Sequence, residues 1–275
     1  MIINKILRNK LSLIAFLVLG VILFAAIFGP GLCKRYQPNK QDYESRSEGI
    51  SKDHWLGTDY MGRDIFTRLI YGARHSISVS VTGVSAGGII GIFLGLLAGY
   101  YGGVIDRVIS GFVEFLMVVP GILLAILVIT LFGKGDFNTI LAVAFSVIAA
   151  FARITRGGVA AVKNSGYIKS CQIIGGSDFR IIFNHILPNV TALIIVTYTL
   201  NLGAALLTVS SLSFLGIGVQ PPAPEWGSMI SAAKDYMLAS PLEMIAPGLA
   251  ITLFVISSSL AGEGLRLALD PRINY

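Results

Sequence analysis

Six long apolar segments divide this chain, and they constrain its fold more than any other feature. They cover about residues 11–28, 77–100, 108–132, 138–152, 189–219 and 241–260. A helix needs roughly 20 apolar residues to cross a membrane, because every backbone polar group must be paired inside the hydrocarbon layer. Hydrophobic residues form 54% of the 275 residues and charged residues only 13%, which is too apolar for a water-soluble protein. The sequence predicts an all-α integral membrane protein with six transmembrane helices.

Three of these segments have irregular features. Pro120-Gly121 interrupts the third segment, and Pro247-Gly248 is expected to break the sixth. The fourth segment is short, so a tilted or partly buried helix is an alternative there. The first segment follows basic residues, as a secretory signal does, but its length and the poor cleavage sequence after Phe28 favour an uncleaved anchor.

The distribution of lysine and arginine predicts the orientation. With six spans, both termini and the loop of residues 164–188 share one side, which carries eleven basic and four acidic residues, whereas the other side carries ten of each. Basic residues accumulate in short cytoplasmic loops. Residues 32–76 hold eight of the ten outer basic residues, but long loops follow this rule weakly. We expect a multi-pass protein of the cytoplasmic (inner) membrane with both termini in the cytoplasm.

Glycine recurs at every fourth position of the second segment. This glycine strip comprises Gly83, Gly87, Gly91, Gly95, Gly99 and Gly103. Residues four apart share one helix face, and a face without side chains lets another helix approach closely. The strip predicts a helix-packing surface, used either within this chain or against a second subunit.

The stretch SCQIIGGSDFRIIFNHILPN, residues 170–189, is polar enough to lie outside the membrane. A helix from about Tyr167 is expected to end at Gly175-Gly176, and Ser177 with Asp178 suits the start of a second helix. Pro188 is expected to close this pair of helices at the membrane surface. The i, i+3, i+4, i+7 spacing predicts one apolar face, formed by Phe179, Ile182, Phe183 and Ile186. A helix that merely rests on lipid headgroups is the alternative to a docking site.

This loop resembles the cytoplasmic coupling motif of ABC-importer permeases, which has Glu-Ala-Ala, three residues, glycine and a later Leu-Pro pair. Three further segments resemble the signatures of the dipeptide, oligopeptide and nickel permease family, C-type subunit. They are HWLGTDYMGRDIFTRLIYGARHS (54–76), SFLGIGVQPPAPEWGSMI (213–230) and GEGLRLALDPR (262–272). The resemblance implies a type I ABC-importer permease fold with cytoplasmic coupling helices. It divides the chain into an N-terminal anchor and extracytoplasmic segment (1–73), a permease domain (74–264) and a cytoplasmic tail (265–275).

The resemblance also implies partners: a homologous second permease, two ABC ATPase subunits and an extracytoplasmic substrate-binding protein, in contact with membrane lipid and without nucleic acid. It assigns the contact with the ATPases to Tyr167, Gly175, Ser177, Asp178, Arg180, Phe183, His185 and Pro188. The sequence departs from the family at Lys169-Ser170-Cys171, which replaces the usual Glu-Ala-Ala, so the role of that glutamate does not transfer. The implied substrates are short peptides, nickel or other metal chelates, and the residues that bind them are unknown.

Motifs for catalysis and for metal binding are missing from the sequence. The nearest approach to a phosphate-binding loop, LFGKGD around Lys134, lacks the leading glycine and the final Ser or Thr. The three histidines are scattered, and Cys33 and Cys171 have no partner spacing. The chain is therefore expected to be a non-catalytic subunit without a metal or cofactor of its own, with ATP and Mg²⁺ bound by the partner ATPases.

Three features outside the loop allow two interpretations each. Glu114 lies inside the third predicted span, either as a functional site or as a structural group that hydrogen-bonds a neighbouring helix near the cytoplasmic interface. Outside the membrane, Asp64 to Ser76 predicts a surface helix with Arg68 on its polar face, and Trp226 predicts an interfacial anchor. Both belong either to a mouth where the binding protein docks or to plain interfacial helices. A secondary transporter driven by an ion gradient is the alternative function, but that class usually has more ionisable residues at mid-membrane.

Overall fold

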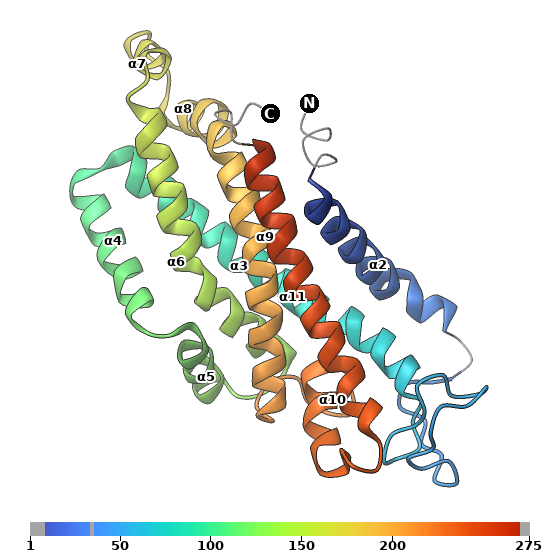
Figure 1. The fold of residues 1–275 in the computed structure, drawn as a ribbon. Coiled ribbons are helices and arrows are strands. Elements are labelled where there is room, and N and C mark those ends of the chain that lie inside the picture. Colours follow the sequence, from blue (N-terminus) through green and yellow to red (C-terminus); the bar gives the residue numbers. More distant parts are fainter. Residues whose placement is uncertain (1–8, 34–35, 270–275) are drawn as a thin grey trace.

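The computed structural model describes residues 9–33 and 36–269 (Figure 1). Its longest helices are α2 (Lys10–Leu32), α3 (Ile65–Tyr101), α6 (Asp136–Lys163), α9 (Leu187–Phe214) and α11 (Pro241–Leu269). The shorter helices are α4 (Gly103–Val118), α5 (Gly121–Phe132), α7 (Gly166–Ile173), α8 (Asp178–Ile181) and α10 (Trp226–Ala233). A π-helical turn, η1 (Ile182–Ile186), joins α8 to α9, and a 3-10 turn, η2 (Lys234–Tyr236), follows α10. Five helices in the described ranges are long and apolar enough to cross a membrane, in agreement with the all-α membrane fold.

The predicted third span is a bent pair of helices. The axes of α4 and α5 form an angle of 94°, with Val119 and Pro120 between them (Figure 1). Pro120 has no N–H to donate to α4, and instead its carbonyl accepts the N–H of Leu124 (3.0 Å) and begins α5. The six predicted spans correspond to five helices and this pair, when the pair counts as one span.

Three predicted helix boundaries are wrong. Helix α3 already begins at Ile65, so the expected surface helix at 64–76 is its first part. Helix α6 continues eleven residues beyond Ala152, because its last turns are charged and escape a search for apolar residues. Helix α11 passes Pro247-Gly248 without a break, although the proline removes one backbone hydrogen bond in the second turn. The domain boundaries expected at 73/74 and 264/265 lie inside α3 and α11.

Arg68 does not lie on a solvent-exposed face. The side chain is only 6% exposed, and its Nη1 donates to the carbonyl oxygen of Pro38 (2.7 Å) and to Oδ1 of Asn39 (3.1 Å). Its Nε is 3.7 Å from a carboxylate oxygen of Asp59. The segment before α3 therefore folds back over the first turns of α3, and the apparent polar face of a surface helix is an internal contact.

The glycine strip of α3 packs against α6 of the same chain. A Cβ atom added at Gly87 would lie 2.3 Å from the carbonyl oxygen of Ala144, and one at Gly99 would lie 2.6 Å from Cβ of Val159. Gly83, Gly91 and Gly95 approach α6 as closely. The strip ends there, because Gly103 has a positive φ of 57°, begins α4 and has open space around it. The sequence left open whether the strip packs within this chain or against a second subunit. In the structure, the five glycines of α3 pack against α6 of the same chain.

Trp226 is part of the protein core rather than an interfacial anchor. It is 2% exposed, and its Nε1 donates to the carbonyl oxygen of Leu69 (3.0 Å). The neighbouring Glu225 is fully buried and accepts hydrogen bonds from the hydroxyl groups of Ser76 (3.0 Å) and Ser210 (3.2 Å) and from the N–H of Ser228 (2.8 Å). These hydrogen bonds connect α10 to α3 and α9, and Trp226 is buried because α10 is held against these two helices.

The helix ends divide between two ends of the molecule. The first turn of α2 and the last turn of α11 lie at the same end as α7 and α8, while α10 and residues 36–64 lie at the opposite end (Figure 1). This arrangement agrees with an even number of crossings. It also places the 164–188 loop beyond the ends of the long helices.

Candidate functional site

The 164–188 loop forms the expected pair of short helices with a glycine turn between them. Helix α7 ends at Ile173, and Gly175 adopts a positive φ of 80°, which is favourable only for glycine. The N–H of Gly176 donates to the carbonyl oxygen of Cys171 (2.9 Å) and closes the end of α7. Ser177 then begins α8, and its Oγ accepts the N–H of Arg180 (3.4 Å).

The apolar residues of the second helix do not form the single face that their spacing predicts. Ile182 and Ile186 are buried, but Phe179 is 71% exposed and Phe183 is 38% exposed, with their ring centroids 4.5 Å apart. The buried face also includes Ile181. The π-helical turn over 182–186 has more residues per turn than an α-helix, so it shifts the register and turns both phenylalanines outward.

Pro188 does not close the unit, which corrects the sequence prediction. It lies in the first turn of α9, and the chain is helical without interruption from Asp178 to Phe214. A proline in the first turn fits a helix, since it has no N–H to donate, and the wider π turn just before it accommodates its ring. The second half of the loop is thus the end of a transmembrane helix.

Three side-chain hydrogen bonds connect this loop and the adjoining ends of α3, α6 and α9. The hydroxyl group of Tyr100, at the end of α3, donates to Oδ1 of Asp178 (2.7 Å), and Nζ of Lys163, at the end of α6, donates to the carbonyl oxygen of Tyr100. Nδ2 of Asn189 donates to the hydroxyl oxygen of Tyr167 (3.0 Å) and so connects α7 to α9. Sequence reasoning missed Tyr100, Lys163 and Asn189, whose only signal is a polar residue at a predicted helix end.

The inner side of the loop is apolar and buried. Ile168 of α7 and Ile181, Ile182 and Ile186 of the second helix join one cluster with Leu96, Tyr100 and Val159. These residues come from α3, α6 and the loop, so the loop packs firmly on both helix ends. Burial of a large aliphatic side chain contributes about 1.5–3 kcal/mol.

The remaining predicted residues of the loop lie at its surface. Arg180 is exposed, and His185 is half-buried and accepts Nδ2 of Asn189 through its backbone carbonyl (2.6 Å). At the departure from the family motif, the Lys169 side chain is exposed and the Ser170 hydroxyl group donates to its own helix. The structure therefore brings Tyr167 and Asp178 into contacts with neighbouring elements and leaves Arg180 available to a partner.

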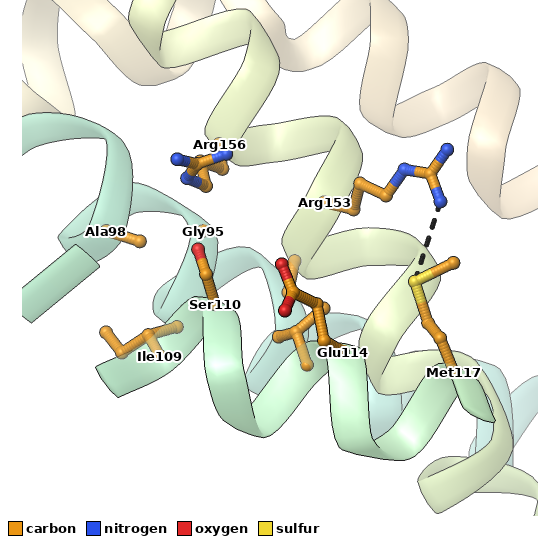
Figure 2. A pocket seen from close by; sticks show the side chains of 10 residues that line it. Gly95, Ala98, Ile109, Ser110, Glu114, Met117, Arg153 and Arg156 are labelled. Atoms are coloured by element: carbon orange, nitrogen blue, oxygen red, sulfur yellow. Dashed lines mark hydrogen bonds between the residues drawn. The ribbon is translucent and has the colours of Figure 1, made fainter. Parts of the chain in front are cut away.

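A second candidate site is a pocket of about 280 Å³ between α3, α4 and α6 (Figure 2). Arg156 and Asp106 form an ion pair there, with Nη2 and Oδ2 2.7 Å apart, and the Ser110 hydroxyl group donates to Oδ1 of Asp106 (3.0 Å). Glu114 extends from α4 toward α6, and Arg153 of α6 contacts only the sulfur of Met117 (3.6 Å). The expected hydrogen bond from Glu114 to a neighbouring helix is absent from the described part of the chain.

Metal ligands are not gathered anywhere in residues 9–33 and 36–269: no three His, Cys, Asp or Glu side chains lie close enough to hold an ion. Cys33 and Cys171 are both free thiols.

Comparison with known proteins agrees with this architecture. Residues 91–275 match the family described as binding-protein-dependent transport system inner membrane component, and residues 1–49 match the N-terminal transmembrane domain of oligopeptide transport permease C. In fold, the chain resembles the MetNI methionine ABC transporter in an inward-facing conformation, with a TM-score of 0.59, 16% identity, and coverage of 74% of this chain and 97% of that one.

Curated relatives cover nearly the whole chain. The glutathione transport system permease protein GsiD of Pectobacterium atrosepticum is 42% identical over 270 residues, which are 98% of this chain and 90% of that protein. The dipeptide transport system permease protein DppC of Alkalihalophilus pseudofirmus is 40% identical over 266 residues, 97% of this chain and 87% of that protein. These relatives are membrane components of transport systems, not their catalytic subunits. The chain accordingly belongs to the family of binding-protein-dependent transport system inner membrane components, as an ABC-importer permease of the inner membrane.

Proposed function

We propose that this permease passes short peptides into the cell, driven by partner ATPases. The observation that carries the proposal is the relationship, at about 40% identity over almost the entire chain, to permeases named for glutathione and dipeptides. Both named substrates are small peptides, so they favour a peptide over the nickel or metal chelates that the sequence resemblance leaves open. An ion-gradient transporter has no support among these relatives.

The 164–188 loop is the proposed docking site for an ATPase subunit. Its outward surface exposes large apolar side chains, which is unfavourable in water: Ile173 is 85% exposed, Ile174 is 82% exposed and Phe179 is 71% exposed. An exposed apolar group next to a basic residue, here Arg180, is typical of a protein interface. The loop lies beyond the long helices, where a cytoplasmic subunit has access to it (Figure 1).

The attachments of the loop provide a route for movement. Asp178 is bonded to Tyr100 of α3, and Ile168 and Ile181 are buried against α3 and α6. Because α8 continues into α9, a displacement of the loop also displaces α9. A docked ATPase that closes on ATP would therefore move three transmembrane helices together, which is the mechanical requirement of alternating access.

The proposed assembly has a homologous second permease, two ATPase subunits and an external binding protein. ATP and Mg²⁺ belong to the ATPases, and this chain supplies the transmembrane path and the docking loop. We place the loop and both termini in the cytoplasm, because this side carries eleven basic and four acidic residues. The opposite end, with α10 and residues 36–64, then faces the binding protein.

Reconstitution of the whole complex in lipid vesicles tests this function. A radiolabelled dipeptide should accumulate only with ATP, the binding protein and intact ATPases, and a catalytically inactive ATPase should abolish the accumulation. Accumulation of a nickel chelate but of no peptide, or accumulation driven by an ion gradient without ATP, would contradict the proposal.

Two variants separate docking from the transmission of movement. Phe179→Ala removes an exposed ring and should weaken ATPase association, while Tyr100→Phe removes one hydrogen bond to Asp178 and should leave association intact but lower uptake per ATP hydrolysed. Tyr101→Phe is the matched control for the second variant, because the adjacent ring is exposed and its hydroxyl group forms no hydrogen bond within residues 9–33 and 36–269. Equal uptake by Tyr100→Phe and Tyr101→Phe would remove Tyr100 from the route.

A further inference from the structure

The pocket between α3, α4 and α6 contains one carboxylate and one guanidinium group that form no ion pair within 4.0 Å in the described residues. Within the described residues, Asp106 and Arg156 neutralise each other at 2.7 Å. Glu114 makes no ion pair within 4.0 Å, although its charge acts on the neighbouring Arg156, and the one hydrogen bond of the Arg153 side chain within the described residues is to the Met117 sulfur (3.6 Å). Figure 2 shows both side chains at the same opening, one from α4 and the other from α6.

These two charged groups lie at similar distances from the cytoplasmic ends of α4 and α6. Glu114 follows Gly103, the first residue of α4, by eleven residues, which is about 16 Å along the helix axis. Arg153 precedes Lys163, the last residue of α6, by ten residues, which is about 15 Å. Both groups therefore lie at similar depth, and Arg153 directly follows the apolar segment that ends at Ala152.

Exposure to lipid is not a stable position for such groups. An ionised side chain in the membrane is costly unless it faces protein or a water-filled cavity. Another face of α4 is suited to lipid instead, because it exposes Val108, Phe112 and Phe115. Hence the face with Glu114 and Arg153 is directed toward an aqueous space.

The chemistry of the pocket matches a zwitterion. One carboxylate suits an ammonium group and one guanidinium suits a carboxylate, with a total charge of zero, whereas an anionic lipid headgroup would be matched by free cations alone. Gly95, Ala98 and Ala152 contribute small side chains to the lining and leave space. A volume of about 280 Å³ is near the lower limit of about 300–1,000 Å³ for small-molecule sites.

We propose that this pocket lines the transport path and binds the two charged ends of a short peptide, with Glu114 contacting the terminal ammonium group and Arg153 the terminal carboxylate. The inference rests on the proposed function as a peptide importer. It adds a substrate site and two specificity-determining residues. The Asp106–Arg156 pair serves as the fixed edge of the site.

End-blocked peptides test the two contacts separately. Vesicles with the complete complex are supplied with a dipeptide in free, N-acetylated or C-amidated form, and maximal uptake rates are compared as ratios. Glu114→Gln should lower the uptake rate of the free peptide about tenfold, so that the free and N-acetylated peptides are taken up at equal rates. Arg153→Gln should instead make the uptake rates of the free and C-amidated peptides equal. A purely structural role would affect all three peptides equally.

Matched controls and a conservative variant keep the result specific. Glu263→Gln and Arg107→Gln change the same residue types at exposed positions outside the pocket and should behave as the parent does. Glu114→Asp should retain the preference for a free amino group. If the parent transports no peptide, the proposed function fails; if the parent does so and both pocket variants keep its ratios, only this inference fails.

Thiol labelling gives a second, independent measurement. In a background with Cys33→Ser and Cys171→Ser, a water-soluble maleimide should label Glu114→Cys and Arg153→Cys, and the dipeptide should slow both reactions at least threefold. Phe112→Cys, which lies about 160° around α4 from Glu114, should stay unlabelled. Absence of labelling at both pocket positions, or labelling that the peptide does not slow in a transporting complex, overturns the proposal. If the Glu114 and Arg153 variants lose assembly of the complex but keep the uptake ratios of the three peptides, the two charges contact the second permease and the proposed substrate site is overturned.

Discussion

A methyl group on the glycine strip should separate α3 from α6. A Cβ atom at Gly91 would lie 2.5 Å from the carbonyl oxygen of Ile148 and 2.7 Å from Cβ of Phe151. Both neighbouring atoms belong to the backbone or to the base of a side chain, so no rotamer change relieves the contact. Gly91→Ala therefore requires the two helix axes to move apart by roughly 1 Å, since nonbonded carbon contacts are comfortable at about 3.5–4.0 Å.

The cost of this separation is that of an overpacked core. An added methylene or methyl group in a well-packed region costs about 1–3 kcal/mol. For a chain of this size, a change of 1 kcal/mol corresponds to about 2–4 °C in a two-state midpoint, so the variant should lose roughly 2–12 °C. Gly95→Ala should behave alike, because its Cβ atom would lie 2.5 Å from the carbonyl oxygen of Ala152.

The measurement is the temperature at which half of the intact, detergent-solubilised complex is lost, as determined by size-exclusion chromatography after heating. Gly157→Ala in α6 is the control, because no atom lies within 4 Å of its added Cβ and the substitution is chemically identical. The control should be neutral or slightly stabilising, as alanine favours a helix more than glycine does. If Gly91→Ala and Gly157→Ala have the same midpoint, α3 and α6 are not in close contact at the strip and the reasoning is refuted.

Three further outcomes are expected. Gly175→Val forces a β-branched residue into a positive φ at a cost of about 1 kcal/mol or more, so ATPase association and uptake should both fall. Gly166→Val is the control and should preserve both, and equal association and uptake in the two variants would contradict the turn at Gly175. Glu225→Gln places an amide N–H₂ where three donors converge and should lower the thermal midpoint by the equivalent of about 1–3 kcal/mol; an unchanged midpoint contradicts this. An impermeant maleimide added outside should label Gln41→Cys and miss Asn164→Cys, and outside labelling at Asn164 would reverse the orientation.

Local patterns predicted much of the loop, because its turn depends on neighbouring residues. The positive φ of Gly175 and the hydrogen bond to Ser177 follow from helix-terminus preferences that are visible in a few letters. The outward direction of Phe179 does not follow, since periodicity assumes an unbroken α-helical register. A π turn changes that register and has no reliable sequence signal, although a proline one turn later, Pro188, is a partial one.

Tertiary contacts account for the other errors. Arg68 is a polar residue opposite an apolar face and so predicts a surface helix, but residues 36–64 cover it and supply carbonyl and carboxylate oxygens. Trp226 next to prolines and a glutamate predicts a membrane interface, but two serine hydroxyl groups and the backbone N–H of Ser228 bind that carboxylate, and the ring is buried. Both partners are distant in sequence, so no local window contains the information.

The close fit of α3 to α6 also connects the two candidate sites. Tyr100 and Lys163 hold the loop at one end of this pair, and the pair supplies Gly95 and Arg153 to the pocket farther along the same helices. Helices in contact through glycine slide or bend independently only at the cost of lost dispersion contacts, so α3 and α6 move as one body. Glu114, in contrast, belongs to α4, which is joined to α3 through two glycines with positive φ at 102 and 103 and is bent away from α5 at Pro120. A displacement of the loop therefore changes the separation between Glu114 and Arg153, and with it the fit of any molecule held between them.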